Sequence, residues 1–225
     1  MLKCENISIL TMDPISFPKI PDSPEENGCN DWTYAMRRDM QEMVPGLYLG
    51  PYAAAMKSKL AVLQGYGITH IVCIRHTLES HFIKPNFQDY FRYLVLDVAD
   101  TVTENIIRIL PKVRDFIEEC FAKKGKVLIH GNAGISRSAT LVIAYIMEQY
   151  GLSYMDAFSY VQQRRFCINP NQGFAQQLRE YEPIYKANLS LRNGHSSQGN
   201  GLLKRKYEQD DESMDTDSSS HMKLT

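Results

Sequence analysis

Residues 126–150 read KVLIHGNAGISRSATLVIAYIMEQY, two apolar segments separated by a short loop of small and polar residues. The first segment, residues 126–130, is short and rich in branched side chains, as buried strands are. The second, residues 135–150, is long enough for a mostly buried helix, and Gly151 after it is a typical helix C-cap. A buried strand that leads directly into a buried helix is typical of α/β proteins.

The rest of the chain shows the same alternation of elements. Short segments rich in branched and aromatic residues predict strands at residues 47–50, 69–74 and 93–96. Longer segments predict helices at residues 53–64, 104–121, 154–164 and 171–185, the third of them opened by Ser153 with Asp156. The sequence therefore predicts an α/β fold, a domain with a central, mostly parallel sheet flanked by helices.

The length of 225 residues fits one domain with tails better than two domains. Residues 1–30 hold four prolines and no helical period, which predicts a flexible N-terminal leader. Residues 191–225 are polar, partly acidic and low in aromatic residues, which predicts a disordered tail. We expect one domain, residues 31–190, between them.

Composition excludes several classes of function. Lys and Arg number 25 against 26 Asp and Glu, so the basic excess of a general nucleic-acid binder is missing. The longest apolar run, residues 139–147, is far shorter than the roughly 18 residues of a membrane span, and the N-terminus is a poor signal peptide. The five cysteines are scattered without metal-ligand spacing, which favours an intracellular protein with reduced thiols and no metal site.

The loop between the central strand and helix has the composition of an anion-binding site. At such a junction the first free backbone N–H groups of the helix point outward, beside the positive end of the helix dipole. Small residues let the backbone curl around an anion, and an arginine in the first helical turn can bind two phosphate oxygens. The sequence therefore predicts a phosphate site formed by Gly131, Asn132, Ala133, Gly134, Ile135, Ser136 and Arg137.

This loop resembles the phosphate loop of the dual-specificity protein phosphatases, H-C-x-x-G-x-x-R-S, in His130, Gly134, Arg137 and Ser138. Residues 93–100 (YLVLDVAD) and 169–174 (NPNQGF) are similar to two further segments of that family. The resemblance implies the compact cysteine-phosphatase fold for the whole domain. At the position of the family's cysteine, however, this chain has Gly131.

The replaced residue is the family's nucleophile, whose thiolate attacks phosphorus while a general acid protonates the leaving oxygen. The resemblance places Asp100 at the general-acid position and Ser138 at the hydroxyl that assists breakdown of the intermediate. It also implies that His130 supports the loop backbone. Because glycine has no side chain that could attack, the chain is similar to the inactive branch of the family, the pseudophosphatases, and we expect neither hydrolysis nor a cofactor.

Three functions stay open on the sequence. The first is the binding of proteins phosphorylated on Ser, Thr or Tyr without hydrolysis, since removal of a thiolate beside a phosphate relieves repulsion on the order of several kcal/mol. The second is a phosphate-independent scaffold, and the third is a slow hydrolase that uses water or another side chain with Asp100. The resemblance implies signalling partners such as MAP kinases and an F-box-type ubiquitin-ligase adaptor, in the cytoplasm and nucleus.

Other reactive or charged residues have structural interpretations. Cys73 and Cys120 fall in a predicted strand and a predicted helix, as core residues do, and the loop directs nothing toward Cys167. Arg164 and Arg165 end a predicted helix. They either complement the helix dipole or form a patch that steers substrates.

Overall fold

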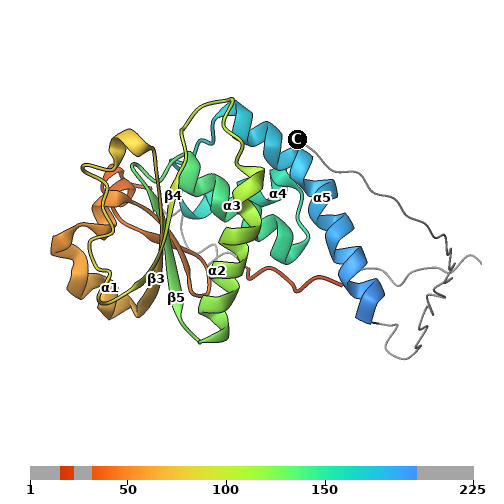
Figure 1. Ribbon diagram of the computed structural model, residues 1–225, viewed down its shortest axis with the longest axis horizontal. Helices are drawn as coiled ribbons and strands as arrows, with labels where there is room; N and C mark the ends of the chain where they lie inside the picture. The colour runs from red at the N-terminus through yellow and green to blue at the C-terminus, as the bar shows by residue number, and fades with distance from the viewer. Residues whose placement is uncertain (1–15, 23–31, 197–225) are drawn as a thin grey trace, which may run out of the picture.

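Five strands form one sheet in the computed structural model, which describes residues 16–22 and 32–196 (Figure 1). The order across the sheet is β1-β2-β5-β3-β4. The strands are β1 (Gln41–Val44), β2 (Leu47–Pro51), β3 (Ile68–Arg75), β4 (Arg92–Asp97) and β5 (Lys126–Gly131). β1 pairs antiparallel with β2, and the other pairings are parallel, so the predicted mostly parallel sheet is confirmed.

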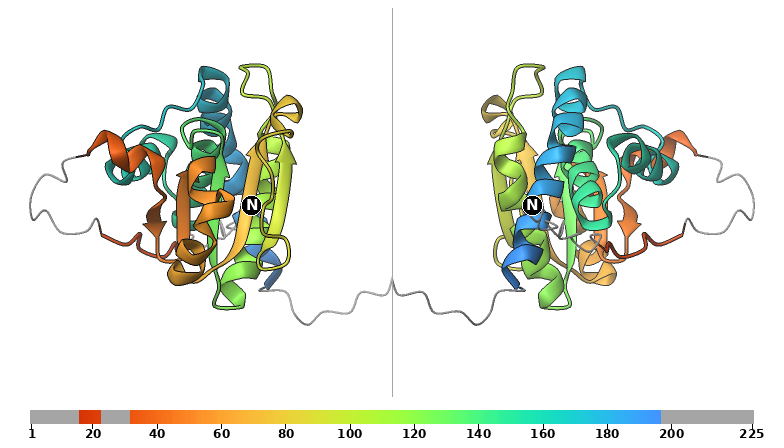
Figure 2. Two further views of the ribbon diagram at one scale, coloured as in Figure 1. Left: turned by 90° about the vertical axis from the view of Figure 1, so that its left-hand side faces the viewer. Right: turned by 90° about the vertical axis from the view of Figure 1, so that its right-hand side faces the viewer.

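The helices cover both faces of this sheet. The α-helices are α1 (Leu60–Tyr66), α2 (Leu110–Ala122), α3 (Arg137–Tyr150), α4 (Tyr154–Arg164) and α5 (Gln172–Ser196). The short 3-10 helices are η1 (Tyr34–Arg38), η2 (Tyr52–Ala55), η3 (Lys57–Lys59), η4 (Thr77–Glu79) and η5 (Ile107–Ile109). Figures 1 and 2 show α1 on one side of the sheet and α2 to α5 on the other.

Alternation along the central strand explains this layering. Val127 and Ile129 of β5 belong to the larger core, which the sheet shares with α2 to α5. Leu128 belongs to the smaller core on the opposite face, with Phe87 and Phe91. β5 therefore lies in the middle of the fold, and the loop that follows it opens at the carboxyl ends of the parallel strands, where ligands bind in α/β folds.

Several elements differ from the sequence predictions. The helix expected over residues 104–121 begins as η5 and becomes α-helical at Leu110. One helix is expected over residues 53–64, but the chain forms η2, η3 and then α1, because Met56 is extended (ψ 157°) and interrupts the helix. The strand β1 has no clear sequence signal, since only Met43 and Val44 of its four residues are buried.

The helix boundaries around the central helix agree with the sequence. α3 ends at Gly151, which has the left-handed conformation of a C-cap (φ 68°). The Ser153 side chain accepts a hydrogen bond from the Asp156 backbone N–H and caps α4. α5, in contrast, continues to Ser196, beyond the end predicted at residue 185 and into the predicted tail.

Part of the expected leader packs against the domain. Phe17 and Ile20 are partly buried on the larger core, and the Tyr160 hydroxyl donates to the Pro21 carbonyl (3.1 Å). Phe17 and Ile20 therefore contact the domain, because their apolar side chains gain burial there, whereas Lys19 and Asp22 stay exposed. The rest of the predicted leader, residues 1–15 and 23–31, and the tail from residue 197 lie outside the described residues. Within the described ranges, no helix is both long and apolar enough to span a membrane.

Candidate phosphate-binding site

The predicted phosphate loop surrounds a cavity of about 270 Å³. β5 ends at Gly131 and α3 begins at Arg137, so five residues curve between the strand and the helix. The structure brings together the following residues around this cavity: Asp100, Gly131, Asn132, Ala133, Gly134, Ile135, Ser136, Arg137 and Ser138. The loop residues singled out from the sequence therefore share one concave surface at the start of a buried helix.

The two glycines of the loop differ in whether the surrounding structure leaves room for a side chain. Gly134 has a left-handed backbone (φ 69°), and a Cβ there would lie 2.6 Å from the Gly50 carbonyl. A Cβ at Gly131 would meet only ordinary contacts, 3.4 Å from the Ile74 carbonyl oxygen and 3.4 Å from Ser138 Oγ. Packing therefore requires glycine at position 134 but leaves room for a side chain at position 131.

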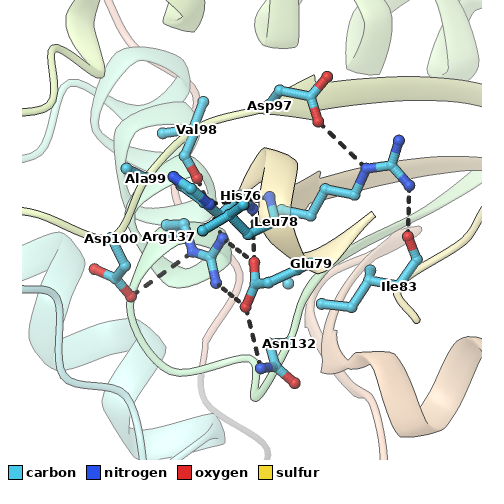
Figure 3. Close-up of polar contacts among 12 residues, drawn as sticks. His76, Leu78, Glu79, Ile83, Asp97, Val98, Ala99, Asp100, Asn132 and Arg137 are labelled. Atoms are coloured by element: carbon cyan, nitrogen blue, oxygen red, sulfur yellow. Dashed lines mark hydrogen bonds and ion pairs between the residues drawn. The ribbon is translucent and has the colours of Figure 1, made fainter. Parts of the chain in front are cut away.

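Arg137 is held by a residue outside the loop. Its Nη1 donates to Glu79 Oε2 (2.6 Å) and to the Val98 carbonyl (3.2 Å), and its Nη2 donates to Glu79 Oε1 (3.0 Å) (Figure 3). These contacts use three of the five guanidinium N–H groups. The remaining two, on Nε and Nη2, lie on one edge of the group, the edge that Asp100 approaches. The sequence did not reveal the role of Glu79.

Glu79 is itself fixed by two further hydrogen-bond donors. Its Oε2 accepts from the His76 backbone N–H (2.6 Å), as part of the capping box of η4, and its Oε1 accepts from Asn132 Nδ2 (3.1 Å). The hydrogen bond from Arg137 is the main reason why the pKa of Glu79 is lowered to about 2. The carboxylate is therefore ionised near neutral pH and binds the Nη1–Nη2 edge of Arg137, while the Nε–Nη2 edge is not hydrogen-bonded to it.

Asp100 lies at the rim of the cavity. Its Oδ1 accepts from Ser136 Oγ (2.7 Å) and from Asn171 Nδ2 (2.7 Å), and its Oδ2 is 3.7 Å from Arg137 Nε. Asn171 belongs to residues 169–174, NPNQGF, one of the segments that resemble the phosphatase family. The structure therefore joins Asp100, Ser136 and Asn171 in one cluster beside the Nε–Nη2 edge of Arg137, where a bound phosphate would meet a carboxylate.

His130 and Ser138 lie beneath the loop. His130 is fully buried with its Nδ1 3.3 Å from the Gly131 carbonyl oxygen, and burial lowers its pKa to about 4, so the ring is neutral near pH 7. Ser138 Oγ is buried and has no hydrogen-bond partner among the described residues. It faces the space that a side chain at position 131 would occupy.

Arg165, at the end of α4, is buried behind the loop with no exposed surface. Its guanidinium donates to the carbonyls of Ala133 (3.2 Å) and Gly134 (2.9 Å) in the loop. Because the C=O and N–H of a trans peptide point in opposite directions, the following amides point away from Arg165, on the cavity side. Neither sequence interpretation of Arg165, helix-dipole complement or substrate-steering patch, describes this position. Arg164 instead lies over the Tyr160 ring, 3.5 Å from its centroid.

The three cysteines that the structure describes offer no alternative nucleophile in the cavity lining. Cys73 and Cys120 are buried, and burial raises the pKa of the Cys73 thiol to about 12. Cys167 is half-buried and does not line the cavity. In the described part of the chain, no group of three or more His, Cys, Asp or Glu side chains is arranged to hold a metal ion.

Residues 47–184 match the family model of the dual specificity phosphatase catalytic domain, and the chain belongs to this family. Within it, the chain is similar to the serine/threonine/tyrosine-interacting proteins. It is 64% identical to serine/threonine/tyrosine-interacting protein A of Xenopus laevis over 79% of each chain. It is 56% identical to the Homo sapiens protein over 88% of this chain and 92% of the relative.

Solved structures agree with this assignment. The crystal structure of the human tyrosine phosphatase-like serine/threonine/tyrosine-interacting protein matches with a TM-score of 0.66 and 66% identity, over 66% of this chain and 99% of that one. A structure of DUSP15 matches with a TM-score of 0.61 and 35% identity, over 70% and 96% of the two chains. The fold implied by the resemblance of the loop is therefore confirmed.

Proposed function

We propose that this domain binds phosphorylated Ser, Thr or Tyr residues of proteins in the cavity of the loop and does not hydrolyse them. The observation that carries the proposal is the combination of an oriented Arg137 with a loop that has no side chain at Gly131. Such a module would compete with active phosphatases for their substrates or anchor phosphorylated signalling proteins.

The geometry supports binding. The Nε–Nη2 edge of Arg137, which Glu79 does not occupy, matches two phosphate oxygens, and Glu79 fixes that orientation before any ligand arrives. The amides of the loop and the start of α3 add donors and a positive dipole end. The absence of a thiolate removes a like charge from beside the phosphate, an effect on the order of several kcal/mol at ~4 Å.

The same geometry argues against hydrolysis. Phosphoryl transfer to the protein needs a nucleophile in the loop, and position 131 supplies none. Asp100 could still protonate a leaving oxygen, but a general acid alone leaves phosphorus without an attacking group. The buried, neutral Cys73 cannot serve, since only a thiolate attacks.

We extend the proposal to the partners and location that the family resemblance implies. The names of the similar proteins describe interaction with serine, threonine and tyrosine, in accord with phosphoresidue recognition. Phosphorylated MAP kinases and an F-box-type ubiquitin-ligase adaptor, in the cytoplasm and nucleus, are the partners to test first.

A phosphate-independent scaffold is the second candidate, and Asp100 favours it. Its carboxylate is already 3.7 Å from Arg137 Nε, so a phosphate entering the cavity must compete with a resident anion. In a scaffold of this kind the loop would be retained for packing, and partners would bind elsewhere on the domain.

Binding of matched phosphorylated and unphosphorylated peptides separates the two candidates. Wild-type protein should bind the phosphorylated peptide more tightly, and the Glu79→Gln/Arg137→Met variant should lose the difference. This double change removes both charges of the ion pair, so neither is left buried and unpaired. Equal binding of the two peptides would favour the scaffold, whereas release of phosphate by wild type, absent in the double variant, would show a slow hydrolase.

A further inference from the structure

A second cavity lies beside the phosphate loop. It measures about 360 Å³ and is lined by Tyr34, Arg37, Arg38, Pro51, Ala53 and Ala133. Ala133 also lines the phosphate cavity, so the two cavities adjoin at this residue. We call the second cavity the η1 groove, because η1 (Tyr34–Arg38) supplies its charged wall.

The η1 groove is basic and has an aromatic side. Arg38 is exposed and Arg37 half-buried, and the Arg37 guanidinium lies 5.9 Å from the centre of the Tyr34 ring. Tyr34 is 78% exposed, which is unusual for a large aromatic side chain. Among the described residues, no carboxylate lies within ion-pair distance of either arginine. The positive charge is local, because the whole chain has a formal net charge of −1.

Arg165 fixes the position of the groove relative to the phosphate cavity. The side chain that donates to the loop carbonyls of Ala133 and Gly134 also donates to the backbone carbonyls of Arg37 (3.0 Å) and Asp39 (3.0 Å). One buried guanidinium therefore joins the loop to η1. Since Arg165 contacts the backbone of Arg37, the Arg37 side chain remains available for a ligand.

We propose that the η1 groove binds a second anionic group, a carboxylate or a phosphate, on a residue that flanks the phosphoresidue in the bound segment. This inference rests on the proposed function, because it places the phosphoresidue in the cavity of Arg137. An extended chain advances about 3.3 Å per residue, so a side chain a few positions away reaches the adjoining groove. The groove lies on one side of Ala133. An acidic residue in the bound segment should therefore raise affinity only when it lies on one side of the phosphoresidue.

Fluorescence polarisation with nonapeptides tests this inference. Each peptide has a central phosphotyrosine and neutral flanks, and one glutamate is placed in turn at each of the four positions on either side. With wild-type protein, glutamate on one side should raise affinity about three- to tenfold, as expected for partly exposed ion pairs. Phosphoserine at the best position should raise affinity at least as much as glutamate does. Comparing the two peptides shows whether the groove favours a carboxylate or a phosphate. Raising the salt concentration should reduce both gains.

The Arg37→Gln/Arg38→Gln variant should bring the ratio of affinities for acidic and neutral peptides close to one. The matched control, Arg108→Gln/Lys112→Gln, removes two exposed charges that line neither cavity and should keep the gain. A gain that persists in the η1 variant, or that is equal on both sides of the phosphoresidue, would overturn the inference.

The failure of this inference and that of the proposed function are distinguishable. Phosphate-dependent binding of the neutral peptide without any gain from glutamate would overturn the η1 groove alone. Binding that ignores the phosphate and is unchanged in Glu79→Gln/Arg137→Met would overturn the proposed function, and the inference with it.

Discussion

Glu79 and Arg137, 58 positions apart in the chain, form a two-point ion pair beneath the phosphate loop, at 2.6 and 3.0 Å. Only 8% of the Arg137 side chain and 18% of the Glu79 side chain are exposed. The pair turns the guanidinium so that its Nε–Nη2 edge is left for the cavity. The orientation of the main anion-binding group therefore depends on a residue that the loop sequence does not contain.

We expect this ion pair to make stability depend on pH in acid. The pKa of Glu79 is lowered from 4.5 to about 2, chiefly by the hydrogen bond from Arg137. A carboxyl group whose pKa is lower in the folded than in the unfolded protein stabilises the fold fully when the pH is above its unfolded-state pKa. This stabilisation is lost as the pH falls toward the folded-state pKa. The shift corresponds to about 3 kcal/mol. Glu79→Gln should therefore be less stable than wild type by roughly this amount at pH 7, and the two stabilities should converge between pH 4.5 and 2.

Urea unfolding at a series of pH values measures this convergence. His130 acts in a different range, because burial lowers its pKa from 6.5 to about 4, and protonation there should destabilise both proteins equally. Curves of unfolding free energy that stay parallel from pH 4.5 to 2.5 would contradict the linkage assigned to Glu79.

Asp100→Asn should raise the affinity for a phosphopeptide about three- to tenfold. The substitution removes a negative charge 3.7 Å from Arg137 Nε, where the phosphate is proposed to bind, and the amide oxygen can still accept from Ser136. Fluorescence polarisation at fixed salt measures the change. A loss of affinity would indicate instead that the Asp100 carboxylate holds the cavity open through Ser136 and Asn171.

The fold could be predicted from the sequence where burial alone decides the element. The segments 69–74, 93–96 and 126–130 are strands in the structure because their branched side chains fill both faces of the sheet. Burial does not decide β1, which is half polar, or the break at Met56, which is set by a single extended residue. The N-terminal segment around Phe17 has no period that could reveal its packing, because it contacts the core through isolated side chains.

The site could be predicted only within the loop itself. Strand, spacing and small residues bring Gly131 and Arg137 to one cavity, as the sequence indicates. Glu79 and Arg165 reach the same place through tertiary contacts, 58 and 28 positions away from Arg137 in the chain. A lone glutamate after a strand and an arginine at a helix end have common local explanations. No local sequence pattern therefore distinguishes Glu79 and Arg165, which contact the site, from a glutamate or arginine that has only such a local role.

Gly131→Cys should create a measurable phosphatase. A Cβ at position 131 would have only ordinary contacts, and a thiol there would face the unpartnered Ser138 Oγ. The loop amides and Arg137 would lower the thiol pKa. Asp100 lines the cavity, where it could act as the general acid for the leaving oxygen. Hydrolysis of an aryl phosphate by the purified variant measures the gain, with Gly131→Ser as a control that fills the same space without a thiolate. A folded but inactive cysteine variant would show that the position of Asp100 or of the loop amides is unsuited to transfer.

Arg165→Met should destabilise the protein far more than Arg164→Met, its neighbour in the same helix end. Arg165 donates to four backbone carbonyls, those of Ala133, Gly134, Arg37 and Asp39, and all of them lose this donor in the variant. Since a buried carbonyl without a donor costs about 1–3 kcal/mol, we expect a loss of about 3–5 kcal/mol after relaxation. Arg164 is half-buried, lies over the Tyr160 ring and donates to the Tyr160 and Asp22 carbonyls, so its loss should cost less, about 1–2 kcal/mol. Thermal unfolding with and without tungstate checks both effects, because freed loop carbonyls would also let the amides turn away from the cavity and weaken the anion's stabilisation. Equal melting temperatures for the two variants would mean that water replaces the guanidinium, and Arg165 would then not be what holds the loop against η1.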